Sequence, residues 1–143
     1  MSAVISLKGN LALDSSVLVE IFSDSELGNS VFTRLQDESV VSYISRLNLA
    51  EASYVICRKV GHEKARAAAK DLLDSGFLRL EEDIRVHTIA SEMKCERAIS
   101  LVDCYTFAVA EVTGSVPVFA QREIELTREI TKRPFKTPPV FLS

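Results

Sequence analysis

The chain contains 143 residues, of which 47% are hydrophobic and 26% are charged. This hydrophobic fraction excludes an intrinsically disordered chain, and the 5 glycines and 4 prolines exclude a collagen-like or low-complexity sequence. The 17 basic and 20 acidic residues leave a net charge of -3, which taken alone argues against binding nucleic acid through overall positive charge. We expect a single domain over residues 1–143, because no linker-like stretch or internal repeat divides the sequence.

The sequence also lacks the signals of a membrane or secreted protein. Asp14 and Glu20 interrupt the best N-terminal apolar stretch, well short of the roughly 18 residues that span a bilayer. The N-terminal segment carries one basic residue, Lys8, and no cleavage pattern of small residues. We therefore expect no signal peptide, no membrane partner and a cytoplasmic location. The 3 cysteines are scattered and odd in number, which predicts no disulfide framework.

The first half of the chain predicts strands that lead into amphipathic helices. The apolar run over 10–13 ends at Asp14, and an apolar pattern of helical spacing follows, with Asp14 placed to cap the new helix. In chain order we expect a strand over 10–13, helices through 17–22 and over 26–37, a strand over 40–43, and helices over 44–60 and 62–74.

The second half continues this alternation. Residues 101–112 are apolar on nearly all sides, which is typical of a central, buried helix, and Gly114 is placed to end it. In chain order we expect a strand over 77–80, helices over 83–97 and 101–112, a strand over 116–120, a helix over 122–131 and a last edge strand over 140–142.

Strands that alternate with helices usually pair in parallel, with helices on both faces of the sheet. The sequence therefore predicts an α/β protein, a three-layer α/β/α sandwich around a small central parallel sheet of about four to five strands. Ligands in such folds bind at the carboxyl ends of the strands. This edge of the sheet is where functional residues are expected.

Three acids lie among apolar residues at the head or inner side of a predicted element. Asp14 ends the first strand, Glu51 lies within an apolar helix, and Asp103 opens the most apolar helix of the chain. Each also has an ordinary structural explanation. Asp14 could simply cap its helix, and Glu51 could face solvent. Asp103 could interact favourably with the positive end of the helix dipole.

Buried carboxylates need a partner, and no buried Lys or Arg stands out in the sequence. A divalent cation would satisfy them, because Mg²⁺ and Mn²⁺ prefer oxygen ligands. Clustered carboxylates that hold such ions commonly hydrolyse phosphodiesters. The sequence thus indicates a cation site and phosphodiester chemistry.

These acidic segments resemble the motifs of the PIN domain family. Residues 11–18 (LALDSSVL) resemble its opening motif, 49–51 (LAE) its helix acid, and 100–110 (SLVDCYTFAVA) its third acidic motif. The spacings, 37 residues from Asp14 to Glu51 and 52 more to Asp103, also suit the family. The resemblance covers essentially the whole chain and is closest to the VapC-type toxins.

The fourth acidic motif departs from the family. The family pattern after the fourth strand is Thr, one residue, then Asp, whereas this chain has Arg122 in the corresponding place. Glu123 is the nearest substitute and Glu125 a poorer one. Glu123 could equally be a capping or surface acid, so the second metal position stays open while the first, served by Asp14, Glu51 and Asp103, is unaffected.

The resemblance implies an endoribonuclease that depends on Mg²⁺ or Mn²⁺ and uses metal-activated water. Its catalytic and metal-binding residues would be Asp14, Glu51, Asp103 and Glu123. Ser16 would either hydrogen-bond a ligand carboxylate or water, or merely cap its helix. It further implies a toxin that cleaves RNA, a small antitoxin protein as partner, and a homodimer. The alternative is a non-catalytic PIN-like module that binds RNA or protein, which the degraded fourth motif favours.

Basic residues gather near the end of the sequence, at positions 122, 128, 132, 133 and 136. They could form a solvated surface, or they could contact phosphates and guide RNA toward the acids.

Overall fold

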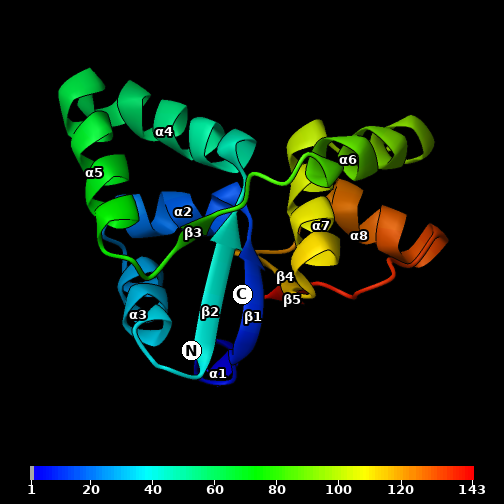
Figure 1. The fold of residues 1–143 in the computed structure, drawn as a ribbon, viewed down its shortest axis with the longest axis horizontal. Helices are drawn as coiled ribbons and strands as arrows, with labels where there is room; N and C mark the ends of the chain where they lie inside the picture. Colours follow the sequence, from blue (N-terminus) through cyan, green and yellow to red (C-terminus); the bar gives the residue numbers. More distant parts are fainter. Residues whose placement is uncertain (1) are drawn as a thin grey trace.

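The computed structural model describes residues 2–143, in which five strands form one parallel sheet (Figure 1). The strands are β1 (Gly9–Leu13), β2 (Val40–Ile44), β3 (Arg79–Leu80), β4 (Val116–Phe119) and β5 (Val140–Phe141), in the spatial order β3-β2-β1-β4-β5. The helices are α1 (Ser2–Ile5), α2 (Ser15–Phe22), α3 (Glu26–Leu35), α4 (Arg46–Val60), α5 (His62–Asp74), α6 (Arg85–Glu96), α7 (Leu101–Thr113) and α8 (Ile124–Lys132).

Helices cover both faces of the sheet. Helices α2 to α5 lie on one side, and α6, α7 and α8 lie on the other (Figure 1). The alternation of β1 explains this division, because Leu11 and Leu13 pack with the first group while Ala12 packs with the second. The predicted three-layer α/β/α fold with a small parallel sheet is confirmed.

The order of the strands creates a switch point at the centre of the sheet. From β1 the chain moves outward through β2 to β3, and then returns to build β4 and β5 on the other side of β1. The connections that leave β1 and β4 therefore separate at the carboxyl ends of these neighbouring strands, where open α/β sheets bind ligands. Asp14 directly follows β1, and residues 120–123 follow β4.

Several predicted boundaries were wrong. The helix expected over 44–60 begins at Arg46, because Ile44 ends β2 and Ser45 caps the helix by accepting a hydrogen bond from the backbone of Asn48. The helix expected over 122–131 begins at Ile124, with Glu123 as its N-terminal cap residue. The strand expected over 77–80 is reduced to the two residues of β3, and short helix α1 was not predicted.

None of the helices in the described part of the chain combines the length and the apolar character needed to cross a membrane.

Candidate active site

Asp14 is a buried acid at the carboxyl end of β1, where it also caps α2. Its carboxylate accepts hydrogen bonds from the Ser16 backbone N–H at 3.0 Å and from the Thr106 hydroxyl at 2.8 Å. Burial raises the pKa of Asp14, and the hydrogen bonds from Ser16, Thr106 and the Ser15 backbone oppose this rise only in part. Asp14 is therefore both a helix cap and an acid held with neutral donors alone.

Glu51 projects from α4, which starts at the carboxyl end of β2. The side chain is partly buried, and burial raises its pKa, with further increases from the negative charges of Asp14 and Glu123. A hydrogen bond from the Ser15 side chain acts in the opposite direction. The charge of Glu51 thus interacts with acids from two other segments.

Asp103 lies in the first turn of α7, and its backbone N–H donates to the Ser100 hydroxyl, which caps that helix. Burial, and then the charges of Asp14 and Glu123, raise the pKa of Asp103 to about 7. Glu51 adds a smaller increase. An acid with this pKa is poised between its neutral and charged forms near neutral pH.

Glu123 and Glu125 differ in how they relate to these acids. Glu123 is exposed at the start of α8, yet its charge raises the pKa of both Glu51 and Asp103. Glu125 contributes to none of these shifts and instead lines a hollow beside Arg128. These observations favour Glu123 over Glu125 as the fourth acid of the cluster.

Acids from four separate segments thus lie within electrostatic range of one another at the centre of the sheet edge. None of the ion pairs found in the described residues involves Asp14, Glu51, Asp103 or Glu123. Within the same residues, no group of three or more His, Cys, Asp or Glu side chains is placed so that it could hold a metal ion. The cluster is an accumulation of negative charge rather than a preformed ligand cage.

Two residues that support this cluster, Asn48 and Thr106, were missed in the sequence analysis. Asn48 is fully buried on α4, and its side-chain amide donates to the hydroxyls of Ser15 at 3.1 Å and Thr106 at 3.0 Å. A polar residue within an apolar helix, one turn before Glu51, is a signal that could have identified Asn48. Thr106, one turn after Asp103, could have been found in the same way.

Ser16 performs a connecting role. Its hydroxyl accepts a hydrogen bond from the backbone N–H of Ala120 at 3.0 Å, and its side chain also hydrogen-bonds Asp14. The start of α2 is therefore tied to the end of β4. Of the two alternatives considered for Ser16, the structure supports the hydrogen bond to a carboxylate, whereas the helix cap is Asp14 and not Ser16.

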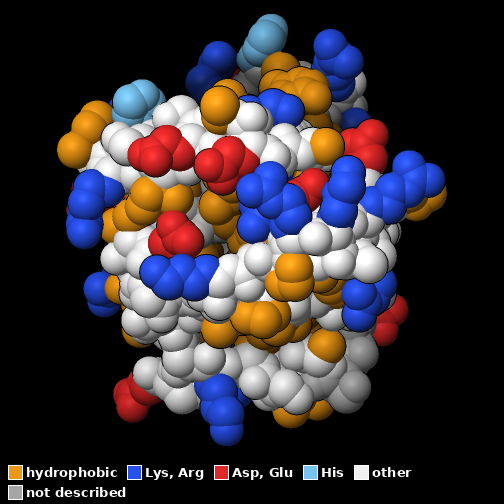
Figure 2. Space-filling view, turned by 90° about the vertical axis from the view of Figure 1, so that its right-hand side faces the viewer, with side chains coloured by type: hydrophobic (Ala, Val, Ile, Leu, Met, Phe, Trp, Pro, Cys, Tyr) orange, Lys and Arg blue, Asp and Glu red, His pale blue; other side chains and the backbone are white. Residues whose placement is uncertain are grey.

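The five basic residues near the end of the chain separate into different environments. Arg122 lies over the Phe141 ring, Arg133 pairs with Glu96 at 3.7 Å, and Lys136 lines a hollow beside α6 and α7. Arg128 and Lys132 instead line a hollow of about 530 Å³ together with Lys94 and Ser100. Figure 2 shows Lys and Arg side chains gathered on the face that carries α6 and α8.

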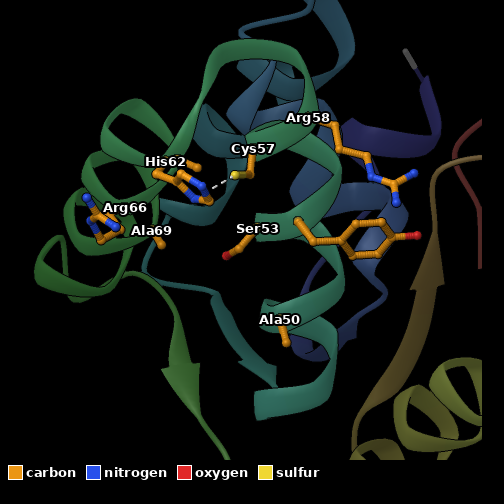
Figure 3. Close-up of a pocket in the computed structure, with 9 residues that line it drawn as sticks. Ala50, Ser53, Cys57, Arg58, His62, Arg66 and Ala69 are labelled. Atoms are coloured by element: carbon orange, nitrogen blue, oxygen red, sulfur yellow. Dashed lines mark hydrogen bonds between the residues drawn. The ribbon is translucent and has the colours of Figure 1, made fainter.

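A second, more apolar hollow lies between α4 and α5 and has a volume of about 650 Å³. Ala50 and Ser53 of α4 and Ala69 of α5 lie on its walls, and Arg58 and Arg66 stand at its sides (Figure 3). The Cys57 thiol contacts Nδ1 of His62 at 3.2 Å across the turn that joins the two helices (Figure 3). Among the described residues, those that line this hollow include no Asp or Glu.

The PIN domain family model matches residues 11–125. Among solved structures, the chain is similar to VapC20 of Mycobacterium tuberculosis, described as a Sarcin-Ricin loop cleaving toxin. The two are 21% identical with a TM-score of 0.62, over 84% of this chain and 94% of VapC20. VapBC2 of Rickettsia felis, solved with a DNA fragment from their promoter, is 14% identical with a TM-score of 0.57, over 85% of this chain and 93% of that chain.

No curated protein sequence matches the chain significantly. The family match spans most of the chain and includes Asp14, Glu51, Asp103 and Glu123. The protein therefore belongs to the PIN domain family. Its fold is that of the VapC structures, as the resemblance in the sequence had indicated.

Proposed function

We propose that this PIN domain protein is a metal-dependent endoribonuclease and the toxin of a toxin–antitoxin pair. The observation that carries the proposal is the cluster of Asp14, Glu51 and Asp103 at the switch point of the sheet, three acids that form no ion pair within residues 2–143. The similarity to a toxin that cleaves the Sarcin-Ricin loop supports the same class of reaction.

The donor set of this cluster fits Mg²⁺ or Mn²⁺. These ions prefer carboxylate oxygens, and a divalent cation would relieve the mutual repulsion that raises the pKa of Glu51 and Asp103. Asp14 and Asp103 would be the principal ligands, with Glu51 and Glu123 as further ligands or as acceptors for bound water. When bound, the metal supplies an activated water and stabilises the leaving oxygen of the phosphodiester.

The chain's own residues orient this site. Thr106 and Ser16 fix the direction of the Asp14 carboxylate, and Ser100 fixes the start of the helix that presents Asp103. Glu123 is exposed at the edge of the cluster, where it can approach a ligand from the solvent side. No side chain is required to form a covalent bond to the substrate.

The hollow lined by Lys94, Arg128 and Lys132 is the proposed path of the RNA strand. It adjoins Asp103 through Ser100, and no ion pair in the described residues engages Arg128 or Lys132. Backbone phosphates are attracted to such cations whatever the base sequence. Changing Arg128 and Lys132 together to Ala should raise KM for RNA, and more so at higher salt, with kcat retained.

A small antitoxin protein is the proposed partner, and the hollow between α4 and α5 is its proposed contact. Apolar walls suit an apolar side chain, and Arg58 and Arg66 suit an acidic neighbour. Replacing Ser53, which lies on the wall of this hollow, by Trp should abolish neutralisation by the co-expressed antitoxin and spare RNA cleavage. A single domain over residues 1–143, a homodimer and a cytoplasmic location are predictions that accompany this proposal.

The alternative is a non-catalytic PIN-like module that binds RNA or protein. The departure of the fourth motif from the family pattern favours it, because Glu123 is one position later than the expected Asp and exposed. The retention and clustering of Asp14, Glu51 and Asp103 favour the enzyme.

An RNA cleavage assay separates the two. Protein purified free of antitoxin is incubated with structured and single-stranded RNAs in Mg²⁺, in Mn²⁺ and in a chelator. We expect cleavage by the wild type with either metal, and a loss of at least about 100-fold for Asp14→Asn and Asp103→Asn. Asp71→Asn, a change of the same type on the exposed surface of α5, is the matched control. Absence of cleavage by the wild type with both metals would favour the non-catalytic module.

A further inference from the structure

Asn48 is the polar centre of a hydrogen-bond network that joins three helices. Its side-chain amide is buried, donates to Ser15 of α2 at 3.1 Å and to Thr106 of α7 at 3.0 Å, and accepts from the Ser45 hydroxyl that precedes α4. All of its side-chain hydrogen-bonding atoms therefore have partners within the protein. Such a fully connected buried network restricts the rotation of every member.

The network has a defined direction of hydrogen bonding. A hydroxyl group has one proton, and the two N–H groups of Asn48 each point at a hydroxyl oxygen, so neither hydroxyl can donate back to Asn48. Thr106 is then free to donate to Asp14 at 2.8 Å, a shorter distance than the 3.3 Å to its other acceptor, the Val102 carbonyl. Ser15 is likewise free to donate to Glu51.

We propose that Asn48 is a positioning residue that directs the hydroxyl protons of Ser15 and Thr106 toward Glu51 and Asp14, and so orients two acids from different helices. This inference rests on the proposed function and extends it to residues that touch neither metal nor RNA. Groups that hydrogen-bond to metal ligands commonly change metal affinity by about 10- to 100-fold when they are removed.

The substitution Asn48→Asp gives the sharpest test. It keeps the shape of the side chain but replaces the two N–H donors by a carboxylate oxygen, so that Ser15 and Thr106 turn their protons toward residue 48 and away from Asp14 and Glu51. Asn48→Leu removes the hydrogen bonds without adding a charge. Asn29→Asp, on the exposed part of α3, adds the same charge outside the site and is the control.

Because Asn48 is completely buried, either change could prevent folding. A second pair of variants therefore leaves Asn48 in place. Thr106→Val removes the donor to Asp14 while keeping the shape of the side chain, and Thr106→Ser restores the hydroxyl. Circular dichroism and thermal melting establish that each variant is folded before it is compared.

The main measurement is Mn²⁺ binding by calorimetry in the absence of RNA, followed by kcat and KM for RNA cleavage. We expect Asn48→Asp, Asn48→Leu and Thr106→Val to weaken Mn²⁺ binding by about 10-fold or more and to lower kcat with little change in KM. Thr106→Ser and Asn29→Asp should behave like the wild type.

Mn²⁺ affinity and kcat unchanged in a folded Asn48 variant, or in Thr106→Val if the Asn48 variants do not fold, would overturn this inference and leave the proposed function intact. A wild type that neither binds Mn²⁺ nor cleaves RNA would instead overturn the proposed function itself. The two failures are therefore distinguishable.

Discussion

Glu129 and Asp14 are both buried acids, but their surroundings differ. Glu129 pairs with Arg97 at 3.0 Å, an ion pair that is itself largely buried, and so its charge is balanced inside the protein. Asp14 receives hydrogen bonds from Ser16 and Thr106 but has no cationic partner among the described ion pairs. This contrast supports the proposal that Asp14 is a functional carboxylate, because the charge of Glu129 is balanced by a cation inside the protein and the charge of Asp14 is not.

A second buried polar group, the hydroxyl of Ser42, allows the cost of an unpaired buried group to be measured as a change in the free energy of unfolding. The Ser42 hydroxyl on β2 is buried and has no hydrogen-bond partner in the described part of the structure. Ser42→Ala removes this group and should raise the free energy of unfolding by about 1 kcal/mol, measured by urea denaturation. Ser39→Ala is the control, because that hydroxyl is exposed and donates to Asp37 at 2.7 Å. A lower stability of Ser42→Ala would show that the hydroxyl has a favourable role.

Residues of the site differed in how far the sequence could predict them. Asp14, Glu51 and Asp103 stood out because each is an acid among apolar neighbours. The role of Asn48 could not be predicted, since its partners Ser15 and Thr106 are 33 and 58 residues away in the chain. Hydrogen bonds over such separations depend on how helices pack, which local sequence patterns do not encode.

At the level of elements, the close packing of α2 against α3 depends on Gly28. A Cβ atom at this position would overlap the backbone carbonyl of Glu20 at the end of α2. The Gly28 N–H also donates to the Ser25 hydroxyl at 2.9 Å, which caps α3. The close approach to the Glu20 backbone therefore requires a residue without a side chain.

We therefore expect Gly28→Ala to lower the free energy of unfolding by about 1–3 kcal/mol or more, because backbone cannot move aside as a flexible side chain can. Urea denaturation of the variant and of Asn29→Ala, an exposed neighbour on the same helix, measures the difference. Equal stability of Gly28→Ala and the wild type would show that α2 and α3 can separate without loss.

The order and type of the main elements were predictable because their hydrophobic patterns are strong, whereas their ends were not. Ile44 continues the apolar pattern of both β2 and the following helix, so the boundary at Ser45 is set by pairing with β3 and by the cap. Glu123 was expected within a helix, but that helix starts at Ile124, the residue that follows Glu123. This difference places Glu123 at the edge of the site instead of on a helix side.

On the scale of the whole molecule, the sheet order brings together acids that are far apart in the sequence. Asp14, Glu51, Asp103 and Glu123 interact electrostatically although they come from the junction of β1 and α2, from α4, from α7 and from the residue before α8. The parallel topology was predictable and so was the edge of the sheet that carries the site. The net charge of -3 is thus compatible with RNA, since part of the acidic excess is committed to the proposed cation site.

This cluster should make the stability of the metal-free protein depend on pH. The pKa of Asp103 is raised from 3.8 to about 7, so the folded state binds this proton more tightly than the unfolded state. The contribution of protonated Asp103 to the stability of the folded state is fully present below about pH 4. This contribution is lost as the pH rises through about 7. Burial raises the pKa of Asp14 and Glu51 in the same direction.

Thermal melting in a chelator between about pH 5 and pH 8 measures this effect. We expect the difference in Tm between Asp103→Asn and the wild type to grow as the pH rises, with Asp71→Asn as control. Saturating Mg²⁺ should stabilise the charged form of Asp103 in the wild type. It should therefore remove most of the difference between the two proteins in how Tm changes with pH. Parallel pH profiles for Asp103→Asn and the wild type would contradict the assigned pKa.

We propose that the acids at the switch point hold a divalent cation. Anomalous diffraction from crystals soaked in Mn²⁺ tests it most directly. We predict a peak bounded by the carboxylates of Asp14 and Asp103 in the wild type, and its loss or marked weakening in Asp103→Asn. A wild-type crystal with no Mn²⁺ peak at these residues, or with peaks only elsewhere on the surface, would contradict the claim.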